Sequence, residues 1–451
     1  MKTSFLILLN KLIYMICRLF GKDGSVFPAS LVRPIDKDIL SKIKYPKYVI
    51  GVTGSSGKGS TTSLIAHILE DNNYKVVWNK SGSNVVNGTT TLILNNTNIF
   101  SHKMKCDILL LEMDESYIKE TFKNSTLTHL VITNITRDQP ARNGEPEIIF
   151  NKILSSIDDN THLIINVDDS LVNRFKLYHK GKITTYGIDK TKYSIKEPFS
   201  HNIDAAYCPI CHNKLKYSFY HYGHFGKYTC PNKDFERNTD YLAKKIDLEN
   251  QTIEINEITY HLNKDVFFAV YYTIAAYTLC KTLGLSDENL KHSLNDNPQE
   301  SKRLKTYNFN NRKVEMIESK NENNLSYLQS LNYINNHKED KTIIIGFDNV
   351  SRRYNYNDIS WLYDVDFEIL DLKTIDKIIV IGRFRLDVLA RLNTAGIPDD
   401  KIILVDNMKN INEILNNTKG TIFTMVCFDM TAILKKIFME DKNDKNSAFI
   451  L

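Results

Sequence analysis

Apolar and polar positions alternate along the chain in a regular rhythm from residue 47 onward. The run YVIGVTG (48–54) is apolar, rich in β-branched residues and ends in glycine, and residues 61–72 carry apolar side chains at helical spacing before the next strand at 75–78. Further strand-like apolar runs occupy 107–113, 129–135, 162–169 and 182–188. This alternation predicts a mostly parallel sheet with helices on both faces.

Two segments interrupt the rhythm. Residues 205–238 gather cysteine, histidine, tyrosine and lysine, and we interpret them as an insertion. Residues 266–285 are almost entirely apolar. Because polar segments and further strands flank this stretch, we predict a buried core helix rather than a membrane span.

A polar stretch at 286–313 indicates the boundary to a last domain. Beyond it, the strand-like runs 342–347, 377–383, 401–406 and 421–427 alternate with helical patterns. The pattern predicts a smaller Rossmann-like α/β domain. We therefore expect an N-terminal helical segment (1–45), a central domain (46–300) that contains the insertion (205–238), and a C-terminal domain (310–451).

The segment 4–20 is the first candidate for a membrane helix. It is interrupted by Asn10, Lys11 and Arg18 and lacks a small-residue cleavage site, so it is too polar to span a bilayer or to act as a signal peptide. We expect a helix docked on the body of the protein. The alternative is an interfacial helix on the inner face of a membrane, because Lys11 and Arg18 share one helical face.

Composition narrows the protein class. The 451 residues are 42% hydrophobic and 25% charged, which is typical of a globular protein of two or three domains. The net charge of +5 is too small and too dispersed to indicate nucleic-acid binding. Three of the seven cysteines cluster within 208–230, which favours a reducing, cytoplasmic setting and a local metal site over a disulfide framework.

The strongest chemical motif is GVTGSSGKGSTT (51–62), between a predicted strand and a predicted helix. Small residues allow backbone N–H groups to surround phosphate oxygens, and Lys58 supplies positive charge at the terminal phosphates. Because glycine follows the lysine, we expect the Mg²⁺-binding hydroxyl at Ser60. The predicted nucleotide-binding residues of the loop are Gly54, Ser55, Ser56, Gly57, Lys58, Gly59, Ser60 and Thr61.

Two further polar loops follow predicted strands. Glu112, Asp114 and Glu115 end the apolar run 107–113, where a carboxylate beside a phosphate loop commonly holds the metal or its water. The loop 133–145 gathers charged and amide side chains that suit Mg²⁺ or a carboxylate substrate, or an ordinary charged loop. Its members are Arg137, Asp138, Gln139, Arg142 and Glu145.

The insertion carries the start of a zinc ribbon. Cys208, Cys211 and Cys230 have ribbon spacing, but lysine occupies the fourth cysteine position. The candidates for a fourth ligand are His212, His221, His224 and Asp234. A metal-free insertion held by aromatic packing is the alternative.

Taken in order, these motifs resemble the Mur ligases, and in particular the branch that works as the synthetase subunit of a glutamine amidotransferase. The resemblance rests on GSSGKGST (54–61), SGSNVVNG (81–88), LLEMDE (110–115), NITRDQPARNGE (134–145) and GRFRLDVLARLNTAGI (382–397). The segment NDISWLYDVDFEIL (357–370) selects the amidotransferase branch. The resemblance implies a Mur-ligase-like central P-loop ATPase domain with a zinc-ribbon-like insertion and a Rossmann-like C-terminal domain.

The same resemblance implies an ATP-dependent carbon–nitrogen ligase. Its reaction phosphorylates the α-carboxylate of D-glutamate in the stem peptide of lipid II, and ammonia converts the acyl phosphate to D-isoglutamine. Lys58 and Glu112 are then catalytic, Ser60 and Glu112 hold Mg²⁺, and Asn84 and Arg137 join the ATP contacts. Cys208, Cys211 and Cys230 are the implied zinc ligands.

Ammonia needs a source that this chain does not encode. Cys17, Cys106, Cys280 and Cys427 lie in apolar contexts without a nucleophile motif. The resemblance implies a heterodimer with a GatD-like glutaminase, whose Cys-His pair an aspartate of this chain completes, and lipid II as substrate at the membrane surface, without nucleic acid. By motif position that aspartate is Asp358, with Asp364 and Asp366 as alternatives, and a helix cap as the purely structural interpretation.

Three other functions stay open at this point. One is another Mur-type amide ligase such as a folylpolyglutamate synthase, which shares the KGST spelling. The second is a P-loop protein whose ribbon binds nucleic acid. The third is a diverged non-catalytic paralogue, since Ala269 and Tyr272 replace family asparagines, and Lys302-Arg303 and Tyr356 replace family glycine motifs.

Overall fold

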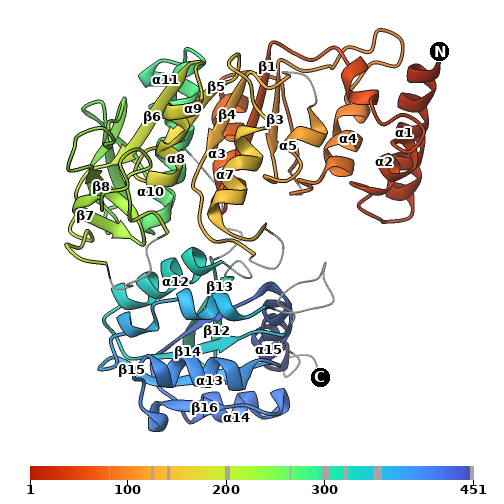
Figure 1. Cartoon of the computed structure of the whole chain (residues 1–451). Coiled ribbons are helices and arrows are strands. Elements are labelled where there is room, and N and C mark those ends of the chain that lie inside the picture. The colour runs from red at the N-terminus through yellow and green to blue at the C-terminus, as the bar shows by residue number, and fades with distance from the viewer. Residues whose placement is uncertain are drawn as a thin grey trace. The chain divides into compact units, whose positions relative to one another are not determined.

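The structure is a computed structural model that describes residues 1–80, 82–122, 126–139, 143–198, 204–264, 266–296, 304–318, 323–348 and 358–446. The chain forms two compact units (Figure 1). The first unit comprises 1–135, 146–196 and 205–299, and the second comprises 136–145, 197–204 and 300–451. Residues 136–145 and 197–204, which the sequence analysis assigned to the central domain, thus belong to the second unit.

The first unit is built on a nine-stranded sheet in the order β11-β10-β9-β6-β5-β4-β1-β3-β2. The seven neighbouring strands β9, β6, β5, β4, β1, β3 and β2 pair in parallel. Strands β10 and β11 continue the sheet beyond β9 as an antiparallel edge. The strands are β1 (Tyr48–Thr53), β2 (Val76–Trp78), β3 (Ile108–Glu112), β4 (His129–Ile132), β5 (His162–Asn166), β6 (Ile183–Ile188), β9 (Tyr241–Asp247), β10 (Thr252–Ile255) and β11 (Ile258–His261). The predicted parallel sheet is confirmed, whereas the sequence patterns did not indicate β9 to β11.

Helices cover both faces of this sheet. One face packs against α3 and α10, which contact each other along their lengths. The other face joins α1, α2, α4, α5, α7 and α8 in one hydrophobic core. The helices are α1 (Lys2–Leu19), α2 (Phe27–Val32), α3 (Lys58–Asp71), α4 (Val86–Asn95), α5 (Ile118–Thr121), α7 (Pro146–Leu154), α8 (Ser170–Asn173), α9 (Phe175–Tyr178), α10 (Phe267–Thr282) and α11 (Asp287–Asn295), with a 3₁₀ turn η1 (Ile39–Lys42).

Helix α10 confirms the predicted core helix. It is apolar on all sides, and twelve of its sixteen residues are buried. Within the described residues, no helix is both long enough and apolar enough to cross a membrane. A helix without a polar face needs neighbours all round it, which α3, β5, β6 and β9 provide.

The insertion forms a separate two-stranded antiparallel sheet from β7 (Lys216–Tyr222) and β8 (Phe225–Thr229). An aromatic cluster docks it on α10, because Tyr222 and Phe225 lie edge-on to Tyr271. Buried hydrogen bonds also fix the orientation of the insertion on α10. Tyr271 donates a hydrogen bond to Asp168 (2.9 Å), which is also paired with Arg237.

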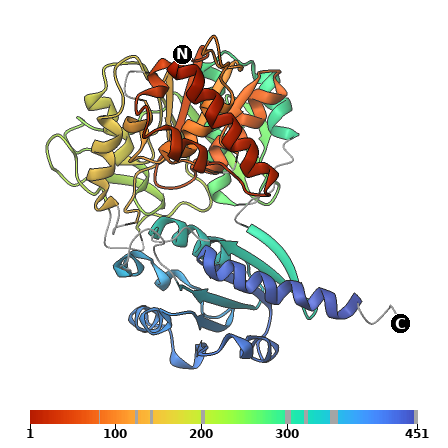
Figure 2. The same ribbon diagram turned by 90° about the vertical axis from the view of Figure 1, so that its right-hand side faces the viewer.

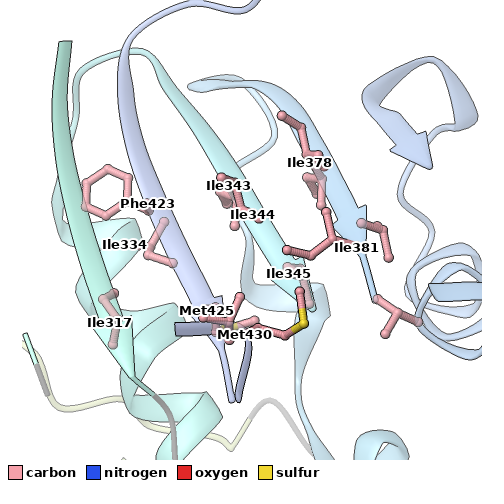
Figure 3. Close-up of a cluster of buried hydrophobic side chains, with 14 of the residues drawn as sticks. Ile317, Ile334, Ile343, Ile344, Ile345, Ile378, Ile381, Phe423, Met425 and Met430 are labelled. Carbon is pink, nitrogen blue, oxygen red and sulfur yellow. The ribbon is translucent and has the colours of Figure 1, made fainter. Parts of the chain in front are cut away.

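The second unit is a six-stranded sheet in the order β12-β13-β17-β14-β15-β16, parallel except for the β12–β13 hairpin. Isoleucines from β14 and β15 meet Phe423 and Met425 of β17 in its core (Figure 3). The elements are β12 (Leu304–Phe309), β13 (Arg312–Glu318), α12 (Asn324–Asn336), β14 (Lys341–Gly346), η2 (Ser360–Asp364), η3 (Phe367–Ile369), β15 (Ile375–Ile381), α13 (Arg385–Thr394), η4 (Asp399–Lys401), β16 (Ile402–Leu404), η5 (Met408–Asn410), α14 (Ile411–Asn416), β17 (Thr421–Val426) and α15 (Phe428–Asn446). The predicted Rossmann-like arrangement is confirmed.

Two buried histidines begin neighbouring strands of the first unit. His129 begins β4, His162 begins β5, and their ring centroids lie 5.2 Å apart. Burial, together with the nearby positive charge of Lys182, lowers the pKa of both imidazoles to about 4. The folded protein therefore resists protonation of these rings at a pH where an exposed histidine takes up a proton.

We expect the first unit to lose stability as the pH falls from about 6.5 towards 4. In that range the unfolded chain binds protons at both histidines and the folded chain largely does not, so protonation favours unfolding, by up to about 2–3 kcal/mol for each histidine at pH 4.5. Hydrogen exchange of the β4 and β5 amides, corrected for intrinsic rates, measures this loss, with β14 and β15 as internal reference. His129→Gln/His162→Gln should flatten the dependence and the exposed His261→Gln should not. An unchanged slope in the double variant would contradict the assignment.

Candidate nucleotide-binding site

The candidate site lies where three parallel strands end. Strand β1 pairs with β3 on one side and with β4 on the other, and Val52 is in register with Glu112 while Thr53 is in register with Ile132. The residues that follow the three strands therefore meet at one edge of the sheet. In open α/β sheets, this edge is where ligands bind.

The loop from Gly54 to Gly57 depends on glycine at both ends. Gly54 has a φ of +128°, and a Cβ there would lie 2.3 Å from Thr133 Oγ1. Gly57 has a φ of +79° and precedes the first residue of α3. Glycine adopts such angles without steric cost, so the backbone can turn sharply and bring the α3 N-terminus to the sheet edge.

The two residues that follow β4, Thr133 and Asn134, hold the loop in place. Ser55 N donates to Asn134 O (2.9 Å), and Ser56 N donates to Asn134 Oδ1 (2.9 Å). In return, Ser56 O accepts from Thr133 Oγ1 (2.7 Å) and Asn134 Nδ2 (3.0 Å). These bonds shape the loop without a ligand, which is the preorganisation that a phosphate cradle requires.

Lys58 is buried at the start of α3 beside Glu115. Its Nζ lies 2.7 Å from Glu115 Oε1 and also donates to Gly54 O. Glu115 Oε1 accepts from Gly54 N as well (3.2 Å). Both side chains are almost completely buried. The ion pair therefore holds the ammonium group against the loop that is predicted to bind the terminal phosphates.

Glu112 is held next to the first turn of α3. Its Oε1 accepts a hydrogen bond from Asn84 Nδ2 (3.1 Å). The Asn79 side chain hydrogen-bonds to both the backbone N–H and the backbone C=O of Glu112, at 2.8 Å each. A Cβ on Gly59 would lie 3.2 Å from Glu112 Oε2, so the carboxylate faces the turn that carries the exposed Ser60. Carboxylate and hydroxyl oxygens are the ligand types that Mg²⁺ prefers.

The structure thus brings together the predicted Lys58, Ser60, Glu112 and Asn84 in the first unit. Sequence reasoning did not identify the roles of three supporting residues. Glu115 pairs with Lys58, Asn134 hydrogen-bonds to the loop, and Asn79 hydrogen-bonds to the backbone of Glu112. Glu115 was visible only as one of several acids after β3. The two asparagines stand at strand ends, where no spacing rule distinguishes them from turn residues.

Arg137 and the candidate aspartates belong to the second unit. Arg137 Nη1 lies 2.8 Å from Asp364 Oδ2. Burial raises the pKa of Asp364, and Arg137 opposes this effect. The neighbouring Asp138 accepts from Asn323 Nδ2 (2.9 Å). The predicted ATP contact of Arg137 stays a prediction.

Asp358 precedes η2, and its Oδ1 accepts from Ser360 N (2.9 Å). This bond is a local cap of the kind that aspartate commonly makes. Asp364, in contrast, is engaged by Arg137. Arg142, Lys302, Arg303 and Tyr356, which were singled out in the sequence, lie outside the described residues.

The three ribbon cysteines converge with one carboxylate. The Sγ atoms of Cys208, Cys211 and Cys230 and an oxygen of Asp234 all lie within 4.8 Å of one another. Cys211 Sγ is 3.2 Å from Cys230 Sγ, and Cys208 Sγ is 3.3 Å from Asp234 Oδ1. Tetrahedral zinc with thiolates at about 2.3 Å separates two sulfurs by roughly 3.8 Å. The donor set therefore fits zinc after shifts of up to about 1 Å in the separations between ligand atoms.

The histidine candidates for the fourth ligand lie elsewhere. His221 faces Ile188 O (3.2 Å), and His224 faces Asp169 Oδ1 (3.0 Å). Both rings are buried and connect the hairpin to the first unit rather than to the cysteines. Among the described residues, Asp234 is the side chain that completes the group.

Comparison with known proteins agrees with this site. Residues 52–232 match the Mur ligase middle domain, and residues 319–432 match the MurT ligase C-terminal domain. The chain thus carries Mur ligase domains over most of its length, and the second of them is the C-terminal domain of the MurT ligases.

Similar proteins support both the family and the fold. The MurT subunit of lipid II isoglutaminyl synthase (glutamine-hydrolyzing) from Staphylococcus aureus (strain COL) is 29% identical, over 86% of this chain and 87% of that protein. A pseudomurein peptide ligase type C from Methanothermus fervidus has a TM-score of 0.65 at 19% identity, covering 89% of this chain and 81% of the other. MurF from Thermotoga maritima in complex with ADP has a TM-score of 0.58 at 16% identity, covering 93% and 85%.

Proposed function

We propose that this chain is the synthetase subunit of a lipid II isoglutaminyl synthase. It uses ATP to phosphorylate the α-carboxylate of D-glutamate in the lipid II stem peptide, and ammonia then displaces phosphate to form D-isoglutamine. The observation that carries the proposal is the MurT-type C-terminal domain joined to a phosphate loop with a buried lysine. That C-terminal domain favours this reaction over a folylpolyglutamate synthase.

The chemistry suits the residues at the sheet edge. A carboxylate oxygen leaves poorly, so its conversion to an acyl phosphate, which is a mixed anhydride, makes the carbonyl reactive towards ammonia and lets phosphate leave. The loop N–H groups and Lys58 hold the terminal phosphates and stabilise the charge that develops during transfer. Glu112 and Ser60 would hold Mg²⁺, which neutralises phosphate charge when bound.

Ammonia is supplied by a partner glutaminase of the GatD type. The name of the Staphylococcus aureus relative includes glutamine hydrolysis and the word subunit, which supports a two-chain enzyme. We place Asp358 at the contact with the partner's Cys-His pair. The substrate carries a lipid anchor, so the complex works at the inner face of the membrane.

Cys208, Cys211, Cys230 and Asp234 would hold zinc in the ribbon. Four protein ligands would leave no position open to substrate, so the metal would have a structural role. It would tie the loop before β7 to the turn after β8. The small cluster of Leu215, Tyr228 and Phe235 packs around the same cysteines and shields them from water.

Two variants at Lys58 should separate its effect on turnover from its effect on stability. Lys58→Ala leaves Glu115 buried without its cation, so we expect a loss of about 3–5 kcal/mol in stability. Lys58→Ala/Glu115→Gln removes the unpaired charge and should regain most of this stability. Its ATP-dependent amidation should still be lower by about 10²–10³-fold. Product formation by mass spectrometry and thermal unfolding measure the two effects. The exposed Lys180→Ala is the control, and a folded double variant with wild-type turnover would refute the nucleotide site.

Asp358→Asn should separate the two nitrogen sources. Asparagine can still accept the bond from Ser360 N, so the local cap survives while the negative charge is lost. We expect glutamine-driven amidation to fall by about 10²-fold and amidation driven by added ammonium to stay within about twofold. The exposed Asp399→Asn, at an aspartate outside the candidate set, is the matched control. Equal loss with both nitrogen sources would place Asp358 in the synthetase site, and no loss with either would leave it a cap.

The purified full-length chain should contain about one equivalent of zinc. Asp234→Ala should weaken retention against a chelator by about tenfold or more, because one of four ligands is lost. The nearby exposed Glu236→Ala should not. Cobalt substitution provides a second measurement, because thiolate-to-cobalt absorption reports the cysteines directly. Less than about half an equivalent of zinc, or equal retention in the two variants, would favour a metal-free insertion.

A further inference from the structure

Helix α1 exposes a continuous apolar stripe. The side chains of Phe5, Leu8, Leu12, Met15, Ile16 and Leu19, called here the exposed stripe, are each more than 40% accessible to solvent. At 100° per residue, these positions fall within a sector of about 100°. Exposed single apolar residues are common, but a whole helical face of them indicates an interaction surface.

The opposite face of α1 is already occupied. Leu6, Ile7 and Asn10 are completely buried, and α1 packs against α2 and α4. Asn10 Nδ2 donates to Asn95 Oδ1 (2.9 Å) and Lys11 Nζ to Asn95 O (2.6 Å). These contacts fix the orientation of the helix, so the exposed stripe does not turn inward.

The segment that follows α1 exposes further apolar side chains. Phe27 and Leu31 of α2, and Ile35 shortly after it, recur at intervals of four residues and are exposed. In Figure 2, α1 runs across the side of the first unit that is nearest the viewer. Eleven of the 21 exposed large hydrophobic side chains among the described residues lie in the first 45 positions. About half of these side chains therefore lie in one tenth of the chain.

The net charge of the protein lies in the same segment. Residues 1–45 hold eight Lys/Arg and three Asp/Glu, a net charge of +5, and the rest of the chain holds 50 of each. Asp36 is buried and paired with Lys42 (2.5 Å), which hides one of the three acids. By helical position, Lys2 and Arg18 flank the exposed stripe on opposite sides. No acidic residue interrupts it.

We propose that the exposed stripe docks on an anionic bilayer surface, with α1 lying in the plane of the interface. An apolar face flanked by cations is the arrangement that inserts into the boundary between headgroups and acyl chains, and nearby cations bind anionic lipids. This deepens the proposed function, because a lipid-linked substrate lies in that surface. The docked helix would bring the first unit to its substrate.

A bilayer fits this surface better than a protein partner does. Protein interfaces are rich in aromatic residues, Met and Arg, and they carry polar groups that form hydrogen bonds across the contact. The exposed stripe contains one Phe and one Met beside four aliphatic side chains, and none of the six carries an N–H or O–H group. A second copy of this chain would bring two surfaces of equal positive charge together, which opposes dimerisation through this face.

Vesicle flotation tests the proposal with the full-length chain. We expect the protein to float with phosphatidylcholine vesicles that contain 30% phosphatidylglycerol, and to float about tenfold less with phosphatidylcholine alone. Phe5→Glu/Leu19→Glu should reduce flotation with the anionic vesicles by about tenfold or more. The matched control is Leu177→Glu/Leu386→Glu, which makes the same charge change at exposed leucines of α9 and α13 and should float like the wild type.

Two further measurements separate the outcomes. Circular dichroism and ATP binding of Phe5→Glu/Leu19→Glu should match the wild type, because both side chains are exposed. Lys58→Ala/Glu115→Gln should lose amidation and keep flotation, so failure of the enzymatic assignment leaves the docking result unchanged. Equal flotation of the stripe variant and the control would overturn the proposal. So would a wild-type dimer, or a complex with the glutaminase, that the stripe variant loses.

Discussion

The buried contact between Lys58 and Glu115 is the interaction on which the site depends. It joins the first residue of α3 to the loop after β3, and both groups also bond to Gly54. A buried ion pair is seldom a source of stability, since desolvation offsets the attraction. Its effect here is positional. It fixes a lysine ammonium group at the edge of a parallel sheet before any phosphate arrives, next to a loop already bonded to β4.

The surrounding structure serves the same edge. Residues after β1, β3 and β4 must converge because their strands are parallel neighbours, and Asn79 and Asn84 then hold Glu112 in its orientation. On the far side of the sheet from α1, helix α10 packs on α3 and carries the hairpin insertion through its aromatic side chains. Asp168, completely buried between Arg237 and Tyr271, sets the direction of that contact.

The family relationship and the geometry explain different things. The match to the Mur ligase middle domain includes the phosphate loop. The MurT-type C-terminal domain is the observation on which the proposal of ammonia as the nucleophile rests. The lysine in the fourth cysteine position shows how the ribbon varies while its geometry persists, because Asp234 lies one residue further along and reaches the same centre.

The sequence by itself determined the strands β1 to β6 and β14 to β17, the phosphate loop and the core helix, because these features depend on local periodicity and on glycine and lysine at fixed spacing. The secondary structure of residues 48–61 is largely fixed by the strand pattern YVIGVTG and the glycine-rich GSSGKGST that overlaps its end. Only the tertiary structure decided that Glu115 pairs with Lys58, that Asp234 rather than a histidine joins the cysteines, and that β9 to β11 extend the sheet. It also decided which face of α1 is buried. Those outcomes depend on contacts between residues far apart in the chain, and local pattern carries no information about such distances.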